Sequence, residues 1–175
     1  MGTVDINKVA LSDVEQLQKI AKDTFSETFS EMNSKENMEK YLEDRLSIDM
    51  LAAELNNENS EFFFAKAENK IVGYLKVNFG SAQTEQQTGN GLEIERIYVL
   101  KAFHGKKVGQ LLYQKAVDIA AQKNADYVWL GVWEENHRAL SFYKKNGFIE
   151  FDKHSFKLGD DVQTDLMMKL ELKNN

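Results

Sequence analysis

Apolar residues recur at helical spacing in the first third of the chain. They predict a helix from a Ser12 cap to about Glu31, and a second helix that begins at a Ser34 cap. We expect this second helix to break before the apolar stretch 48–55, and a short strand over residues 4–9 to precede both helices. The buried face of the first helix consists of Val14, Leu17, Ile20, Ala21, Phe25 and Phe29.

Runs rich in aromatic and β-branched residues predict strands in the rest of the chain. These runs lie at residues 61–80 (two strands about a turn at 68–70), 92–99, 127–133 and 154–172 (two strands about 159–161). The polar, glycine-tipped segment 81–91 is expected to be a mobile surface connection. Helical patterns separate the later strands, and this order favours a mixed sheet with helices on both sides.

A glycine-bearing turn, HGKKVG at residues 104–109, follows the strand that ends near Val99. The turn opens a helix, where the first backbone N–H groups lack partners and the peptide dipoles concentrate positive charge. A diphosphate group is stabilised in that position, and glycines let the backbone approach it closely. From these residues alone, an ordinary strand-to-helix loop fits as well.

The segment NHRALSFYKKNGF, residues 136–148, carries a second pattern. Asn136 is a good helix cap and Gly147 a good terminator, so the helix between them is well bounded. Tyr143 lies seven residues after Asn136, almost two helical turns, and the two side chains share a face. An amide can bind a peptide-like pantetheine arm, and a phenol can give a proton to a departing thiolate. Alone, Tyr143 would more often be a core residue.

The two segments together resemble the GNAT superfamily of N-acetyltransferases. Residues 104–109 correspond to its Q/R-x-x-G-x-G/A acetyl-CoA motif, and residues 136–148 resemble its N-x-x-A-x-x-x-Y-x-K-x-G-F segment. Over nearly its whole length the chain is similar to bacterial PaiA-type spermidine/spermine N-acetyltransferases. The segments that carry this similarity are FSETF, SKENMEKYLE, LEIERIYV, WLGVWEENHRALSFYKKNGF and HSFKLGDDVQTDLMMKL.

The resemblance implies an α/β (α+β) GNAT fold. Its mixed, mostly antiparallel sheet would have six or seven strands, helices on both faces, and a V-shaped split between strands four and five. A bulge near Ile97 and Tyr98 is also implied. Acetyl-CoA would lie across the split, and an amine would approach from the other side and attack the thioester directly. Tyr143 would then protonate the leaving thiolate.

The resemblance also implies which residues hold the cofactor. These are Ile97, Tyr98, Val99, His104, Gly105, Lys106, Lys107, Val108, Gly109, Gln110, Asn136, Ala139, Tyr143 and Lys145. The chain departs from the family pattern twice, since His104 replaces Gln or Arg and Lys107 replaces the first glycine. We expect the Lys107 side chain to point outward, because backbone amides make the phosphate contacts in this family.

An amine acceptor must lose a proton before it attacks. Glu93 and Glu95 alternate with apolar residues, so the strand should aim both carboxylates to one side, where either could accept that proton. Pairing with surface lysines fits each of them equally well. A polyamine also needs carboxylates and aromatic faces along its channel. The proposed substrate-binding residues are Glu31, Tyr41, Glu134 and Asp165, with Glu27, Phe29 and Asp160 as further candidates.

Composition narrows the remaining choices. With 175 residues, of which 42% are hydrophobic, we expect a single domain over residues 1–175. Cysteine is absent and no stretch approaches a bilayer span, so a cytoplasmic protein is expected. His137 and His154 have no ligand partner at a recognisable spacing, which predicts no metal site. A formal charge of -6 argues against nucleic-acid binding.

Several alternatives remain at the level of sequence. The acceptor could instead be a protein N-terminus, a lysine side chain or another small amine, because cofactor motifs do not select the acceptor. A non-catalytic acyl-CoA-binding regulatory module is a different class, and Tyr143 with the two strand glutamates weighs against it. The chain could be a monomer or a homodimer.

Overall fold

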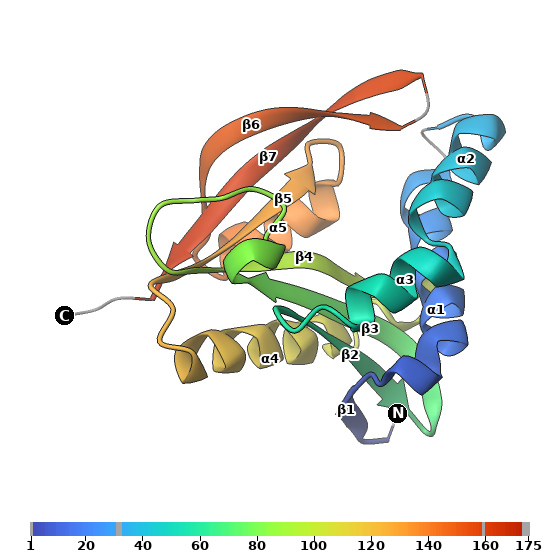
Figure 1. The fold of residues 1–175 in the computed structure, drawn as a ribbon, viewed down its shortest axis with the longest axis horizontal. Helices are drawn as coiled ribbons and strands as arrows, with labels where there is room; N and C mark the ends of the chain where they lie inside the picture. Colours follow the sequence, from blue (N-terminus) through green and yellow to red (C-terminus); the bar gives the residue numbers. More distant parts are fainter. Residues whose placement is uncertain (1, 31–32, 159, 173–175) are drawn as a thin grey trace.

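The computed structural model describes residues 2–30, 33–158 and 160–172, apart from the side chains of residues 156 and 158. The described strands form one seven-stranded sheet in the order β1-β2-β3-β4-β5-β7-β6 (Figure 1). The pair β4–β5 is parallel, and the other neighbours are antiparallel. The strands are β1 (Val4–Lys8), β2 (Ser60–Ala67), β3 (Lys70–Phe79), β4 (Gly91–Val99), β5 (Tyr127–Trp133), β6 (Ile149–Leu158) and β7 (Asp161–Glu171).

Helices cover both faces of the sheet, as predicted. One face packs against α4 (Val108–Gln122) and α5 (His137–Lys145), and the other against α1 (Val14–Phe29), α2 (Lys35–Arg45) and α3 (Ile48–Leu55). The alternation of side chains along β2 divides them between the two cores. Phe63 joins the core of α4 and α5, while Phe62 and Phe64 join the core of α1, α2 and α3.

Of the helix caps expected from the sequence, Ser34 and Asn136 are confirmed and Ser12 is wrong. The Ser34 hydroxyl accepts a hydrogen bond from the Asn37 amide at 3.1 Å, and Ser47 caps α3 in the same way. The expected break before α3 is therefore real. Ser12 instead lies in a 3-10 turn over residues 11–13, because the Asp13 carboxylate accepts from the Ala10 amide at 2.9 Å and the helix begins one residue later.

The C-terminal hairpin is longer than the sequence pattern indicated. Its first strand, β6, begins at Ile149 rather than at His154, and Ile149 pairs with Lys169 of β7. This strand forms the edge of the sheet, and Ile149 is 69% exposed. Residues 149–153 therefore lack the buried face that makes a strand visible in a sequence.

The split between β4 and β5 is confirmed. The two strands pair at Gly91 with Tyr127, Leu92 with Val128, and Glu93 with Trp129, and no later pair is formed among the described residues. The bulge expected near Ile97 and Tyr98 lies earlier, at Glu95, because Lys76 of β3 faces Arg96 while the next residue, Val77, faces Ile94. Beyond Glu93, the β4 edge that faces β5 is left open.

Candidate active site

Two cavities meet at the split between β4 and β5. The larger one, about 870 Å³, lies beside the turn before α4, and we call it the turn cavity. The smaller one, about 390 Å³, has several carboxylates in its wall, and we call it the acidic cavity. The residues that line both cavities are Ile97, Tyr98, Asn136, Ala139 and Tyr143. A ligand in one cavity can therefore reach a ligand in the other.

Backbone groups dominate the end of the turn cavity at α4. The first intrahelical hydrogen bond runs from the Leu111 amide to the Lys107 carbonyl, at 3.1 Å, so the amides of residues 108–110 precede it. Gly105 and Lys107 adopt left-handed conformations with φ of 78° and 66°. His104 Nε2 lies 2.8 Å from the Val99 carbonyl oxygen, which ties the turn to the end of β4. These amides and the helix dipole fit a diphosphate.

Thirteen of the fourteen residues implied to hold the cofactor line this cavity, and Lys106 does not. The Lys107 side chain is exposed, as the outward arrangement requires. Glu27, a candidate for the acceptor's channel, lines the turn cavity instead of the acidic cavity. The other residues that line it were not foreseen: Thr28, Lys101, Phe103, Arg138, Ser141 and Phe142. Arg138, Ser141 and Lys145 follow helical spacing on α5, a signal that the sequence offered. Glu27 comes from α1, and its carboxylate accepts a hydrogen bond from the Lys101 amide at 2.7 Å.

Asn136 and Tyr143 share one face of the α5 region, and this face lines both cavities. The Asn136 side-chain oxygen caps the helix by accepting from the Ala139 amide at 3.2 Å, which leaves its NH₂ group as a donor. Tyr143 is buried, and its hydroxyl makes no hydrogen bond to any described residue. Burial, with a smaller effect of Tyr113, raises the pKa of Tyr143. The phenol is therefore protonated at ordinary pH.

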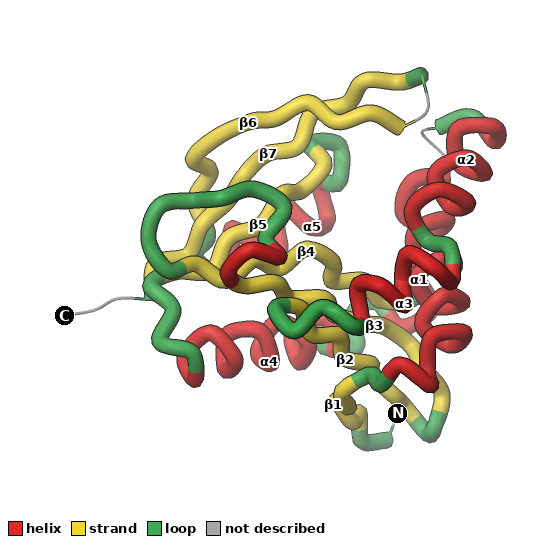
Figure 2. Tube along the Cα trace, in the orientation of Figure 1, coloured by secondary structure: helices red, strands yellow, loops and turns green. Residues whose placement is uncertain are grey.

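Both carboxylate oxygens of Glu93 accept hydrogen bonds from neighbours in the acidic cavity. Glu93 is 3% exposed and accepts hydrogen bonds from Asn78 Nδ2 at 3.0 Å, the Thr84 amide at 2.8 Å and the Thr84 hydroxyl at 2.5 Å. Burial raises the pKa of Glu93, although the bonds from Asn78 and Thr84 oppose the shift. Figure 2 shows the loop that carries Thr84, between β3 and β4, passing beside the sheet.

Glu95 belongs to a buried ion network. Its carboxylate lies 2.6 Å from Lys76 Nζ and 3.4 Å from Arg96, and Glu54 of α3 contacts the same two cations at 3.1 Å. Burial alone would raise the pKa of Glu95, but Arg96 and Lys76 outweigh it and hold the pKa at about 2. Asn78 Nδ2 also donates to Glu95, at 2.8 Å, so the two glutamates lie on one side despite the bulge.

The proposed substrate-binding residues separate into two groups. Tyr41 and Asp165 line the acidic cavity, as does Phe29, and the Tyr41 ring stacks on Phe25 with 4.2 Å between centroids. Glu134 lines neither cavity, and Asp160 is exposed away from both. Glu31 lies outside the described residues.

Within residues 2–30, 33–158 and 160–172, no cluster of His, Cys, Asp and Glu is arranged to hold a metal ion. None of the helices in these ranges is long and apolar enough to cross a membrane.

Comparison with known proteins shows which family the chain belongs to. The acetyltransferase (GNAT) family matches residues 14–148. The chain belongs to the GNAT family. A GNAT relative from Lactobacillus delbrueckii subsp. lactis, named as an N-acetyltransferase, is 40% identical over 98% of this chain and 99% of its own length.

Two more distant matches, one of sequence and one of structure, come from Thermoplasma acidophilum. A spermidine N(1)-acetyltransferase is 26% identical over 83% of this chain and 88% of its own length. The crystal structure of a PaiA N-acetyltransferase in complex with coenzyme A superposes with a TM-score of 0.80, covers 97% of this chain and 99% of the other, and is 24% identical. The structural likeness supports the fold.

As a GNAT N-acetyltransferase, the chain uses acetyl-CoA as its cofactor. The turn cavity fits that molecule, because unpaired amides at the start of α4 suit the diphosphate and the open edge of β4 suits the pantetheine arm.

Proposed function

We propose that this chain transfers the acetyl group of acetyl-CoA to a primary amine of a polyamine, spermidine or spermine. The observation that carries the proposal is the meeting of the two cavities beside Tyr143, since a donor in one and an acceptor in the other would be in contact. Acyl transfer between two bound molecules depends on this proximity.

The turn cavity would position the donor. Amides of residues 108–110 would bind the diphosphate, and Lys107, Arg138 and Lys145 would supply positive charge around it. Open backbone groups of residues 97–99 and the Asn136 NH₂ group would bind the pantetheine arm. When bound, acetyl-CoA supplies a thioester whose carbonyl carbon the amine attacks.

The acidic cavity suits an acceptor with several ammonium groups. Its carboxylates are Glu85, Glu93, Glu95 and Asp165. Its aromatic residues are Phe25, Phe29, Tyr41, Tyr74, Tyr98, Trp129, Trp133 and Tyr143. Carboxylates and aromatic faces both stabilise ammonium groups. The similarity to a spermidine acetyltransferase points to the same class of acceptor.

The surroundings of the two strand glutamates favour a supporting role for them. Glu95 has a pKa of about 2, which makes it a weak proton acceptor at neutral pH. Glu93 uses both carboxylate oxygens to hold Thr84 and Asn78. We therefore propose that Glu93 and Glu95 shape and charge the cavity, in place of the proton transfer first expected of them.

Tyr143 would serve the leaving group. Its raised pKa keeps the hydroxyl protonated, and because it lines both cavities it would lie beside the thioester sulfur of a bound acetyl-CoA. A protonated phenol can donate a hydrogen bond, and then a proton, to the sulfur as the carbon–sulfur bond breaks.

A steady-state assay with spermidine, spermine and a lysine-containing peptide at one acetyl-CoA concentration tests the acceptor. The proposal predicts kcat/KM for a polyamine at least about tenfold above that for the peptide. Activity restricted to the peptide would exclude the polyamine assignment. Saturable binding of acetyl-CoA without turnover of any amine would favour the regulatory module.

A further inference from the structure

We infer that the carboxylate of Asp165 takes the proton from the acceptor's ammonium group, an assignment that rests on the proposed function. The acceptor must lose this proton because a lysine-like amine, with a pKa near 10.4, is neutral only about once in two thousand molecules at pH 7. Asp165 suits this role through its position, its free lone pairs and its proton affinity.

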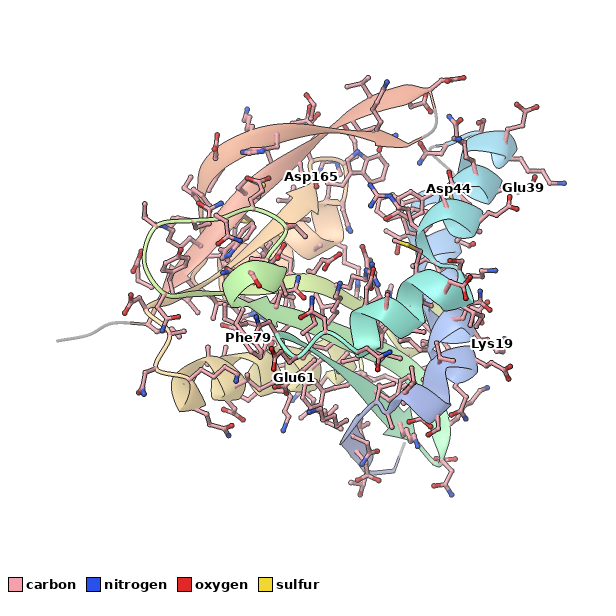
Figure 3. All side chains as sticks on the ribbon, in the orientation of Figure 1. Lys19, Glu39, Asp44, Glu61, Phe79 and Asp165 are labelled. Carbon is pink, nitrogen blue, oxygen red and sulfur yellow. The ribbon has the colours of Figure 1, made fainter. Side chains whose placement is uncertain are left out.

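Asp165 lies where β4 and β5 part. It is on β7 opposite Trp133 of β5, and a methyl group on the neighbouring Gly131 would lie 3.5 Å from Asp165 Oδ2. Pairing between β4 and β5 ends at Glu93 and Trp129, only two residues before Gly131. Figure 3 shows Asp165 beside the end of β5. An amine bound in the acidic cavity would therefore share it with this carboxylate.

The other carboxylates of the acidic cavity already have partners. Glu93 accepts from Asn78 and Thr84, and Glu95 accepts from Asn78 and is paired with Lys76 and Arg96. The remaining one, Glu85, lies 2.9 Å from Nδ1 of His154. In the described ranges, the Asp165 carboxylate has no hydrogen bond and no ion pair. Its lone pairs can therefore receive a proton without breaking an existing contact.

The surroundings of Asp165 also raise its proton affinity. Burial raises the pKa of Asp165 to about 6, with His154 of β6 opposing the shift and Glu85 of the β3–β4 loop adding to it. A proton acceptor works best when its pKa lies near the operating pH, since it is then still ionised and yet basic. Asp165 meets that condition at pH 7, and Glu95 does not.

In the transfer a carbon–nitrogen bond replaces the carbon–sulfur bond, and each proton that moves has a donor and an acceptor. The ammonium nitrogen gives its first proton to an Asp165 oxygen, which releases it to solvent. The nitrogen lone pair then forms the carbon–nitrogen bond, and the carbon–sulfur bond breaks with its electron pair on sulfur. Tyr143 gives that sulfur a proton and regains one when the amide nitrogen loses its second proton, directly or through solvent.

The test compares wild type with Asp165→Asn at saturating acetyl-CoA and spermidine between pH 5.5 and 9. The inference predicts that wild-type kcat falls as the pH drops below about 6. In Asp165→Asn, kcat should be about 100-fold lower at pH 7. The deficit should narrow as the pH rises, because the fraction of neutral amine grows.

The matched control is Glu171→Gln, which makes the same change of carboxylate to amide on the same strand, β7, at an exposed residue that lines neither cavity. Its kcat should stay within about threefold of wild type. Thermal unfolding of each variant shows whether it is folded, and the wild-type pH profile tests the inference without any variant. A kcat for Asp165→Asn within about threefold of wild type, or a rise in KM alone, would overturn it. A wild-type enzyme inactive on every amine would overturn the proposed function instead.

Discussion

Three carboxylates in the wall of the acidic cavity differ in chemistry because their neighbours differ. Glu95 is held ionised by Lys76 and Arg96, and Glu93 is buried and accepts hydrogen bonds. Asp165 is part-buried and has no hydrogen bond or ion pair among the described residues, although His154 lies opposite it on β6. The pKa of Glu95 is lowered, and the pKa values of the other two are raised. Their roles in binding or proton transfer follow from these surroundings.

Glu95 should make the protein sensitive to acid. Its pKa is about 2 when folded against an ordinary 4.5, so its stabilising effect is present above pH 4.5 and is lost as the pH falls toward 2. Between pH 7 and pH 3, wild type should lose about 2 kcal/mol more of its unfolding free energy than Glu95→Gln. Urea unfolding at the two pH values measures this difference.

Glu93→Gln is the control for that experiment. Because the pKa of Glu93 is raised, its protonation favours the folded state, and removing it should not reduce acid sensitivity. Equal acid sensitivity of wild type and Glu95→Gln would contradict the assigned ion network.

The role proposed for Tyr143 as proton donor can also be tested by a single substitution. Tyr143→Phe removes the proton donor but keeps the ring in the core, so kcat should fall about 100-fold while acetyl-CoA affinity changes less than about threefold. Tyr113→Phe is the matched control, since Tyr113 is a buried tyrosine of α4 that lines neither cavity. Initial rates and calorimetry give the two quantities. An unchanged kcat in Tyr143→Phe would remove the assigned role.

At the scale of elements, the start of α4 combines a family motif with an unusual residue. Lys107 takes a left-handed conformation, with φ of 66°, at the position where the family has glycine. A side chain in this conformation strains the backbone. In return for this strain, the exposed lysine keeps a positive charge beside the site proposed for the diphosphate. This charge favours the binding of an anion.

Two substitutions at Lys107 separate these effects. Both Lys107→Gly and Lys107→Ala lose the charge, but only glycine relieves the backbone. Lys107→Gly should therefore be about 1 kcal/mol more stable than Lys107→Ala in chemical unfolding. The two variants should bind acetyl-CoA with similarly reduced affinity. A large gain in affinity for Lys107→Gly would mean that the side chain obstructs the site.

Local patterns predicted most elements but not their irregularities. Helical spacing and caps predicted α2, α3 and α5, and aromatic enrichment predicted the β2–β3 hairpin. The bulge at Glu95 was misplaced because an extra residue depends on the partner strand. The start of β6 was missed because an exposed edge strand has no buried face. In the site, the motif residues were found, whereas Glu27 was expected in the acceptor's channel and lines the turn cavity instead, where a long-range hydrogen bond joins α1 to Lys101.

At the scale of the whole molecule, distant parts of the chain enclose the acidic cavity. Helices α1 and α2 lie on one side and the β6–β7 hairpin on the other (Figure 1). Polar contacts join them, from Asn37 to Asp161 at 3.0 Å and from Gln163 to Asn33 at 2.6 Å. The acidic cavity adjoins the turn cavity at the split, and the two together leave room for a donor and an acceptor at the same time.

Initial rates over a matrix of acetyl-CoA and spermidine concentrations test this account most directly. Simultaneous occupation of both cavities predicts lines that intersect in double-reciprocal plots, because both molecules must be bound before acetyl transfer. Parallel lines, which indicate a covalent acetyl-enzyme released between two half-reactions, would contradict direct transfer across the split.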